Sequence, residues 1–303
     1  MSGLQRWLIA GASGLLGVRL GSCLLAHGRH VTAHRWQHPL PPSLAPFGLA
    51  VDLLDGKDAC RRAVEAAAPD VVVNCVGLTN VDQCEREPER AALLNDTQAG
   101  RIAAAARAGG ARFVQISTDH LWDGTRPFVS EDVPPRPINV YAKTKAAGES
   151  AVARAHPEAL ILRTNFFGPG LPWRKSINDW LTEELTAGRA INAFSDVFFT
   201  PMASDLLSAT IAELVDRRVT GVLNVAGAER ISKYDFALRW ARHAGLNSAL
   251  IRAGSVADSA LAAPRPRDMS LDCSKASALL GRPMPSFRES LEAFDRAMAA
   301  HHS

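Results

Sequence analysis

Short apolar runs alternate with longer segments of helical periodicity through the first half of the chain. An apolar run of four to eight residues bounded by turn residues is typical of a buried strand, and longer periodic segments are typical of helices. Six such runs predict strands, at residues 6–10, 30–35, 49–53, 71–75, 113–116 and 160–163. Helices are predicted between them, at residues 18–27, 58–67 and 88–108 and from Tyr141 onwards.

The order of these elements predicts the fold class. The run at 71–75 is almost continuously apolar, as strands are in a parallel sheet covered on both faces. Strands alternating with helices over residues 6–163 predict an α/β fold, with a doubly wound parallel sheet of the Rossmann type. We therefore expect a Rossmann domain at residues 1–165 and a smaller, interleaved C-terminal lobe at residues 166–303. One apolar strand near residues 221–226 is expected to return to the first sheet.

Composition narrows the class of protein. Apolar residues make up 47% of the chain and charged residues 21%, as in ordinary globular proteins. The formal net charge of +3 is small, and no run of Lys and Arg forms a basic patch, which argues against nucleic acid as a partner. The five cysteines are scattered and odd in number, which favours reduced thiols and predicts no metal site.

Targeting segments are not expected. The first residues lead almost directly into a strand, without the charged start, apolar run and cleavage site of a signal peptide. No apolar run reaches the roughly 20 residues that a membrane helix needs. We therefore expect a cytoplasmic protein that has no contact with a membrane.

A glycine-rich turn links the first predicted strand to the first predicted helix. Residues 11–17 read GASGLLG, which gives the spacing GxxGxxG. Glycines let the backbone approach a pyrophosphate, and the following helix N-terminus offers free N–H groups to it. The alternative is a simple tight turn, but the strand and helix on either side favour dinucleotide binding. The candidate cofactor-binding residues in this turn are Gly11, Ser13, Gly14, Leu15, Leu16 and Gly17.

Other strand ends supply further cofactor candidates. His34 and Arg35 end the second strand, where an acidic residue would favour NAD and an arginine accommodates the 2′-phosphate of NADP. We therefore predict that NADP(H) is favoured over NAD(H), the alternative being a solvated arginine. At the ends of the third and fourth strands the candidates are Asp52, Leu53, Cys75, Val76 and Gly77.

The segment from Gln115 to Glu149 carries the candidate chemistry. A strand ends there in Ser117-Thr118, and a helix carries Tyr141 and Lys145 four residues apart, on one helical face. The hydroxyl of tyrosine has a pKa near 10, and a nearby ammonium lowers it, which makes Tyr141 a workable general acid or base. Thr118 is placed to hydrogen-bond the reacting carbonyl oxygen, and Lys145 to bind the nicotinamide ribose. The predicted catalytic residues are Thr118, Tyr141 and Lys145, and Tyr141 and Lys145 are also candidate cofactor-binding residues.

These motifs, in this order, resemble the extended short-chain dehydrogenases/reductases. The chain is similar in particular to the dTDP-4-dehydrorhamnose reductase family, whose patterns resemble STDYVFDG and YGxxKxxGE. Here they read STDHLWDG at residues 117–124 and YAKTKAAGE at residues 141–149. The resemblance extends through Thr79-Asn80-Val81-Asp82, Leu162-Arg163-Thr164 and Ser232-Lys233-Tyr234. It covers nearly the whole chain.

The resemblance implies NAD(P)H-dependent reduction of a 4-keto group on a nucleotide-linked deoxysugar. Residues 166–303 would then mainly bind the substrate. The implied substrate-binding residues are Thr79, Val81, Asp119, His120, Asn165 and Phe166. Three positions depart from the family pattern: His120 replaces a tyrosine, Leu78 replaces an aromatic residue or histidine, and Phe166 replaces a tryptophan.

Other functions stay open. A sugar-nucleotide epimerase or dehydratase would use the same residues while keeping its cofactor bound. The segments Arg265-Pro266-Arg267 and Leu271–Lys275 resemble the regulatory beta subunit of methionine adenosyltransferase, which implies a non-catalytic role as the other alternative. A homodimer is also left open by the sequence.

Overall fold

The computed structural model describes residues 5–35, 37–50 and 55–302 of the chain. The chain folds into two compact units. Unit 1 is drawn from residues 1–118, 139–163 and 208–223, and unit 2 from residues 119–138, 164–207 and 224–303. The chain therefore passes several times between the two units, so they are interleaved in sequence.

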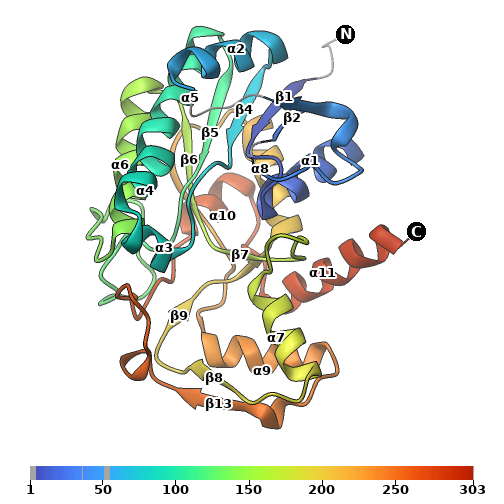
Figure 1. Ribbon diagram of the computed structural model, residues 1–303, viewed down its shortest axis with the longest axis vertical. Coiled ribbons are helices and arrows are strands. Elements are labelled where there is room, and N and C mark those ends of the chain that lie inside the picture. Colours follow the sequence, from blue (N-terminus) through green and yellow to red (C-terminus); the bar gives the residue numbers. More distant parts are fainter. Residues whose placement is uncertain (1–4, 36, 51–54, 303) are drawn as a thin grey trace. The chain divides into compact units, whose positions relative to one another are not determined.

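A seven-stranded sheet organises unit 1 (Figure 1). Its order is β11-β6-β5-β4-β1-β2-β3, and the pairs that join β1 to β6 are parallel. The predicted doubly wound parallel sheet is thus confirmed. The strands are β1 (Arg6–Ala10), β2 (His30–Arg35), β3 (Gly48–Ala50), β4 (Val71–Asn74), β5 (Arg112–Ile116), β6 (Leu160–Thr164) and β11 (Gly221–Val225).

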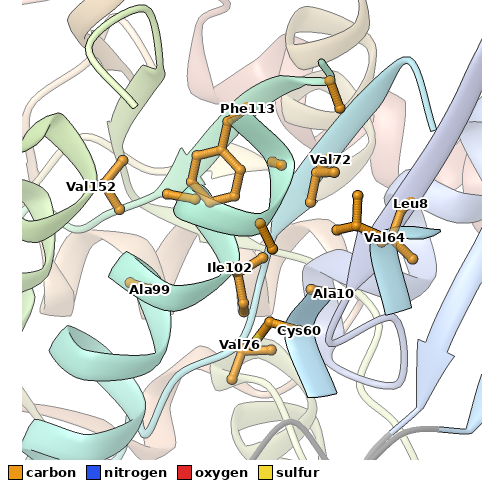
Figure 2. Close-up of a cluster of buried hydrophobic side chains, with 14 of the residues drawn as sticks. Leu8, Ala10, Cys60, Val64, Val72, Val76, Ala99, Ile102, Phe113 and Val152 are labelled. Atoms are coloured by element: carbon orange, nitrogen blue, oxygen red, sulfur yellow. The ribbon is translucent and has the colours of Figure 1, made fainter. Parts of the chain in front are cut away.

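Helices cover both faces of this sheet. The helices of unit 1 are α1 (Leu15–Ala26), α2 (Lys57–Ala67), α3 (Val81–Arg86), α4 (Pro88–Ala92), α5 (Gln98–Ala108) and α6 (Val140–Ala155), joined by the end of α8 (Ser204–Asp216). Figure 2 shows the core on one face, where Val64 of α2, Ile102 of α5 and Val152 of α6 gather around Val72 and Phe113 of the strands. On the other face, α1 approaches Ile9 closely at Gly21.

One predicted helix is divided in the structure. The segment 88–108 was expected to be continuous, but α4 and α5 are separated by a π-helical stretch, Leu93–Thr97. Such a bulge turns residues out of the regular helical register, and here it contains the buried Asn95. The side chain of Asn95 bonds the backbone N–H and C=O of Leu78 at 2.8 and 3.0 Å. The bulge therefore holds the loop that follows β4.

Unit 2 is built around aromatic side chains and three two-stranded sheets. Phe236 lies with its ring centroid 5.3 Å from both Phe167 and Phe287 and 5.6 Å from Phe199. The strand pairs are β7 (Phe166–Phe167) with β10 (Met202–Ala203), β9 (Phe198–Phe199) with β12 (Ile231–Ser232), and β8 (Ile191–Phe194) with β13 (Ile251–Gly254). Its helices are α7 (Ile177–Thr186), α9 (Lys233–His243), α10 (Ser274–Leu280) and α11 (Phe287–His302).

Two further observations concern the described residues alone. No helix among them has the length and apolarity that crossing a membrane requires. Nor do three or more His, Cys, Asp or Glu side chains in the described ranges gather as metal ligands would. The cytoplasmic location and the homodimer remain predictions.

Candidate functional site

The glycine turn is shaped by close backbone approaches. Gly11 has a φ of +79°, and a Cβ at this residue would lie 3.0 Å from the backbone of Cys75 and Val76. A Cβ at Gly17 would lie 2.7 Å from the Cα of Ala12. The N–H of Gly14 donates to the carbonyl of Gly11 at 3.0 Å, and α1 begins at the next residue. The turn therefore requires glycine at positions 11 and 17 and leads directly into a helix N-terminus.

His34 is hydrogen-bonded to this turn through both its ring and its backbone carbonyl. Its ring is buried, and its Nδ1 accepts the backbone N–H of Gly11 at 3.2 Å. The carbonyl of His34 also accepts the N–H of Ala12 at 2.9 Å. The imidazole is thus engaged by the turn itself. Arg35 is exposed at the end of β2. The predicted preference for NADP therefore depends on Arg35.

The strand ends beside the turn hold the other cofactor candidates. Asn74 accepts the N–H of Val76 at 3.1 Å and donates to the side chain of Gln115 at 2.9 Å. This fixes Cys75 and Val76 at the end of β4, and burial raises the pKa of the Cys75 thiol to about 12. A Cβ at Gly77 would lie 2.9 Å from Oδ1 of Asn95. Asp52 and Leu53 lie outside the described residues.

Three polar contacts fix α6: a cap at its N-terminus, a bond from α3 and a bond to the end of β5. Asn139 caps the helix by accepting the N–H of Ala142 at 2.8 Å, and Glu85 accepts the N–H of Val140 at 3.0 Å. The ammonium of Lys145 donates to the carbonyl of Ile116 at 2.7 Å. Because Thr118 follows Ile116 by two residues, this bond joins the helix to the strand end that carries the candidate hydroxyl.

Thr118, Tyr141 and Lys145 are all buried, at 4, 7 and 5% exposure. Tyr141 and Lys145 are one turn apart on α6. Burial lowers the pKa of Lys145 to about 8, against the opposing effect of the Glu149 carboxylate, which raises it. All three predicted catalytic residues belong to unit 1. The structure thus places the predicted tyrosine and lysine on one element, and the lysine contacts the strand that leads to Thr118.

A buried ion pair lies next to this arrangement and was missed by the sequence analysis. Glu149 accepts two bonds from Arg163, 3.0 Å from Nε to Oε1 and 2.8 Å from Nη2 to Oε2. It also accepts the hydroxyl proton of Ser117 at 2.5 Å. The spacing of Glu149, four residues after Lys145, was visible in the sequence. Its partner on β6 could be assigned only from the fold.

The substrate candidates fall in both units. Thr79 is exposed in the loop before α3, and Val81 begins that helix in unit 1. In unit 2, Asn165 donates to the Asp119 carboxylate at 2.6 Å. Nε2 of His120 lies 3.9 Å from the same carboxylate. Burial lowers the pKa of His120, and the charges of Lys233 and Arg265 lower it too, against the opposing effect of the Asp119 carboxylate.

Phe166 lies in β7, where it pairs in register with Met202 of β10. The structure therefore brings Asp119, His120 and Asn165 together. Lys233, a charged neighbour of this group, was noted in the sequence only as part of a family motif.

The chain was compared with known proteins. The RmlD substrate binding domain family matches residues 5–299. "Probable low-salt glycan biosynthesis reductase Agl14" of Haloferax volcanii is 32% identical, over 97% of this chain and 99% of the relative. "Methionine adenosyltransferase 2 subunit beta" of Xenopus tropicalis is 30% identical, over 96% of this chain and 88% of the relative.

A solved structure gives the same result. The dTDP-4-dehydrorhamnose reductase of Bacillus anthracis, in complex with NADP, superposes with a TM-score of 0.85 at 26% identity. The match covers 97% of this chain and 99% of that one. Family match, relatives and structural likeness all extend over nearly the whole chain. The chain belongs to the RmlD substrate binding domain family, among proteins similar to dTDP-4-dehydrorhamnose reductase.

Proposed function

We propose that the protein is an NADPH-dependent reductase of a nucleotide-linked 4-keto-6-deoxysugar. The observation that carries this proposal is the bond from Lys145 to the carbonyl of Ile116, two residues before Thr118. This bond ties α6, which carries the ammonium of Lys145 and the phenol of Tyr141, to the strand that leads to the hydroxyl of Thr118. Those are the groups that reduction of a carbonyl requires from a protein.

Each residue has a separate role in this reaction. When bound, the nicotinamide cofactor supplies the hydride that adds to the carbonyl carbon. Tyr141 donates its phenolic proton to the oxygen as the alcohol forms, and water later restores that proton. Thr118 donates a hydrogen bond to the same oxygen. Lys145 favours the phenolate by its charge and binds the ribose hydroxyls.

The glycine turn fits a dinucleotide. Because side chains at Gly11 and Gly17 would meet backbone atoms, the turn stays tight and its surface is formed by main chain. A pyrophosphate would bind to the free N–H groups at the start of α1, beside Ser13, Gly14, Leu15 and Leu16. Cys75, Val76 and Gly77 are proposed to contact the cofactor from the end of β4. Substrate would be bound by Thr79, Val81, Asp119, His120, Asn165 and Phe166.

The preference for NADPH rests on Arg35, which is exposed at the end of β2. The B. anthracis relative was solved with NADP, which agrees with this preference. Replacing Arg35 by alanine should weaken NADPH binding by roughly 10-fold or more, because a charged hydrogen-bond partner of the 2′-phosphate is lost. NADH binding should change little, since NADH lacks that phosphate. Fluorescence titration with both cofactors measures the two affinities.

Arg61→Ala provides a matched control, because Arg61 is an exposed arginine of unit 1 whose partner is Glu65 on the same helix. This control should leave both affinities unchanged. Equal losses for NADPH and NADH in the Arg35→Ala variant would remove the reason for preferring NADP.

The reductase proposal is tested by following NADPH oxidation with a panel of nucleotide-linked 4-keto-6-deoxysugars. Stoichiometric oxidation with at least one member is the expected result. Conversion of a sugar nucleotide without net NADPH consumption would instead indicate an epimerase or dehydratase. The assay therefore separates the two enzyme classes directly.

A regulatory role is the second candidate, favoured by the similarity to methionine adenosyltransferase 2 subunit beta. It predicts tight binding of the nicotinamide cofactor without turnover across the panel. Copurification of a methionine adenosyltransferase catalytic chain from the native cell would then support it.

A further inference from the structure

Lys233 is held at a fixed place in unit 2 by its backbone. It is the first residue of α9, and its N–H donates to the carbonyl of Val197 at 2.9 Å. Ser232 caps the helix, with its hydroxyl accepting the N–H of Asp235 at 2.9 Å and donating to the Asp235 carboxylate at 2.7 Å. Ser232 also pairs with Phe198 across the β9/β12 ladder. These backbone contacts therefore fix the position of Lys233 independently of its side chain.

The side chain of Lys233 lacks a conventional partner within the described residues. Its ammonium lies 3.3 Å from the ring centroid of Phe199, and it makes no hydrogen bond or ion pair with any described residue. Burial lowers its pKa to about 8, against the opposing charge of Asp119. The side chain is half-buried, so an ammonium with three donors and one aromatic contact keeps only part of its hydration, which costs stability.

Other buried or half-buried cations are satisfied. Arg230 stacks on the neighbouring ring, Phe198, at 3.6 Å, and it is also bonded to Asp268 at 2.7 Å. In unit 1, Arg163 is paired with Glu149, and Lys145 donates to a carbonyl. Lys233 differs from these three residues because its ammonium has no polar partner among the described residues.

Three charged groups act on His120: Asp119, Lys233 and Arg265. Lys233 and Arg265 both act on His120, and burial holds His120 toward its neutral form. The carboxylate near them is Asp119, which already accepts a bond from Asn165. The half-buried ammonium of Lys233, which has no hydrogen-bond partner among the described residues, is the group here to which an anion can bind.

We propose that Lys233 is a substrate-binding residue whose ammonium holds an anionic oxygen of the ligand, beside Asp119, His120 and Arg265. This rests on the proposed function only in taking the ligand to be a nucleotide sugar. Two parts of such a ligand carry the required oxygen: the diphosphate and, in a uronic acid, the sugar carboxylate. Asp119 directly follows Thr118 in the sequence. The proposed anion subsite therefore includes the residue next to the candidate catalytic threonine.

Lys233→Met tests the proposal by binding, independently of turnover. Calorimetry with dTDP, thymidine, UDP-glucose and UDP-glucuronic acid separates the two sources of the anion. If the diphosphate is held, the variant should bind dTDP roughly 10-fold or more weakly and thymidine unchanged, since a charge-assisted hydrogen bond is lost. If the carboxylate is held, UDP-glucuronic acid alone should lose affinity, while dTDP and UDP-glucose should not.

Two outcomes would overturn the proposal. One is equal affinity of the variant and the wild type for all four probes, and the other is a wild type that binds none of the anionic probes. Because no turnover is required, failure of the reductase assay leaves this result interpretable. Lys275→Met, at an exposed lysine of α10 in the same unit, is the matched control and should bind every probe as the wild type does.

A melting experiment separates binding from a structural role. Methionine keeps the apolar stem on Phe199 and removes an ammonium that lacks a partner, so Lys233→Met should melt at the same or a higher temperature. The folded pKa of about 8 is below the ordinary 10.5, so the lysine destabilises the fold most at and below pH 8. The gain in melting temperature should therefore be present at pH 7 and disappear toward pH 10.5. A variant that melts lower than the wild type at pH 7 would indicate a structural role instead.

Discussion

Replacing Tyr141 by phenylalanine should lower kcat by roughly 10²- to 10⁴-fold, the contribution typical of a positioned general acid. The ring remains, so the buried packing of this residue against Cys84 and Ala91 is kept. Only the hydroxyl that donates the proton is lost. NADPH affinity should change by no more than about twofold, because Lys145 and the glycine turn are untouched. Stopped-flow NADPH oxidation and a fluorescence titration measure the two quantities.

Tyr234→Phe is the matched control, since Tyr141 and Tyr234 are the two tyrosines of the chain. Tyr234 packs against the aromatic core of unit 2, so losing its hydroxyl should leave kcat within about twofold of the wild type. Unchanged turnover in Tyr141→Phe, with a substrate that the wild type reduces, would end the assignment of this residue as the acid. Equal losses in both variants would point to a general effect on folding.

The sheet could be predicted because its strands are short apolar runs separated by clear turns. Val71–Asn74 is fully buried, and the run that predicted it contains no polar residue before Asn74. The glycine turn could also be predicted, because a positive φ at Gly11 and the tight approach of Gly17 to Ala12 leave glycine as the residue that fits. Local sequence was therefore enough to predict the sheet and the glycine turn.

The polar contacts that join α6 to the neighbouring strands could not be predicted in the same way. Ser117, Glu149 and Arg163 come from separate segments of the chain. Their spacing in the sequence does not indicate that the Glu149 carboxylate binds the other two side chains. The π-helical stretch around Asn95 is a second case, because an Ala-rich segment with helical periodicity gives no sign of an extra residue in one turn. Gly148 is the residue that accommodates this bulge, since a Cβ there would overlap the carbonyl of Asn95.

Unit 2 was the least predictable part. Its strands are two to four residues long, too short for periodicity to distinguish them from turns. The cluster of Asp119, His120, Asn165 and Lys233 is assembled from three separate segments of the chain. His120 departed from the family pattern in the sequence, and the structure gives it charged neighbours that the sequence did not connect with it.

Glu149→Gln should destabilise the fold by roughly 3 kcal/mol, because it leaves the buried guanidinium of Arg163 without a compensating charge. The side chains of Glu149 and Arg163 are 8 and 5% exposed, so water does not replace the lost partner. Arg163→Met should cost a similar amount for the converse reason. The double variant should cost at least about 1 kcal/mol less than the sum, as expected for residues that interact directly. Urea denaturation of the four proteins measures the coupling.

The same variant should change the pH dependence of turnover. Burial lowers the pKa of Lys145 to about 8, and the charge of Glu149 opposes this decrease. In the proposed mechanism Lys145 acts in its protonated form, so kcat/KM should fall as the pH rises through about 8 in the wild type. Without the carboxylate the pKa of Lys145 decreases, and the alkaline fall in Glu149→Gln should begin at a lower pH. Additive stability losses would contradict the ion pair, and an unmoved alkaline limb would show that Lys145 titrates independently of Glu149.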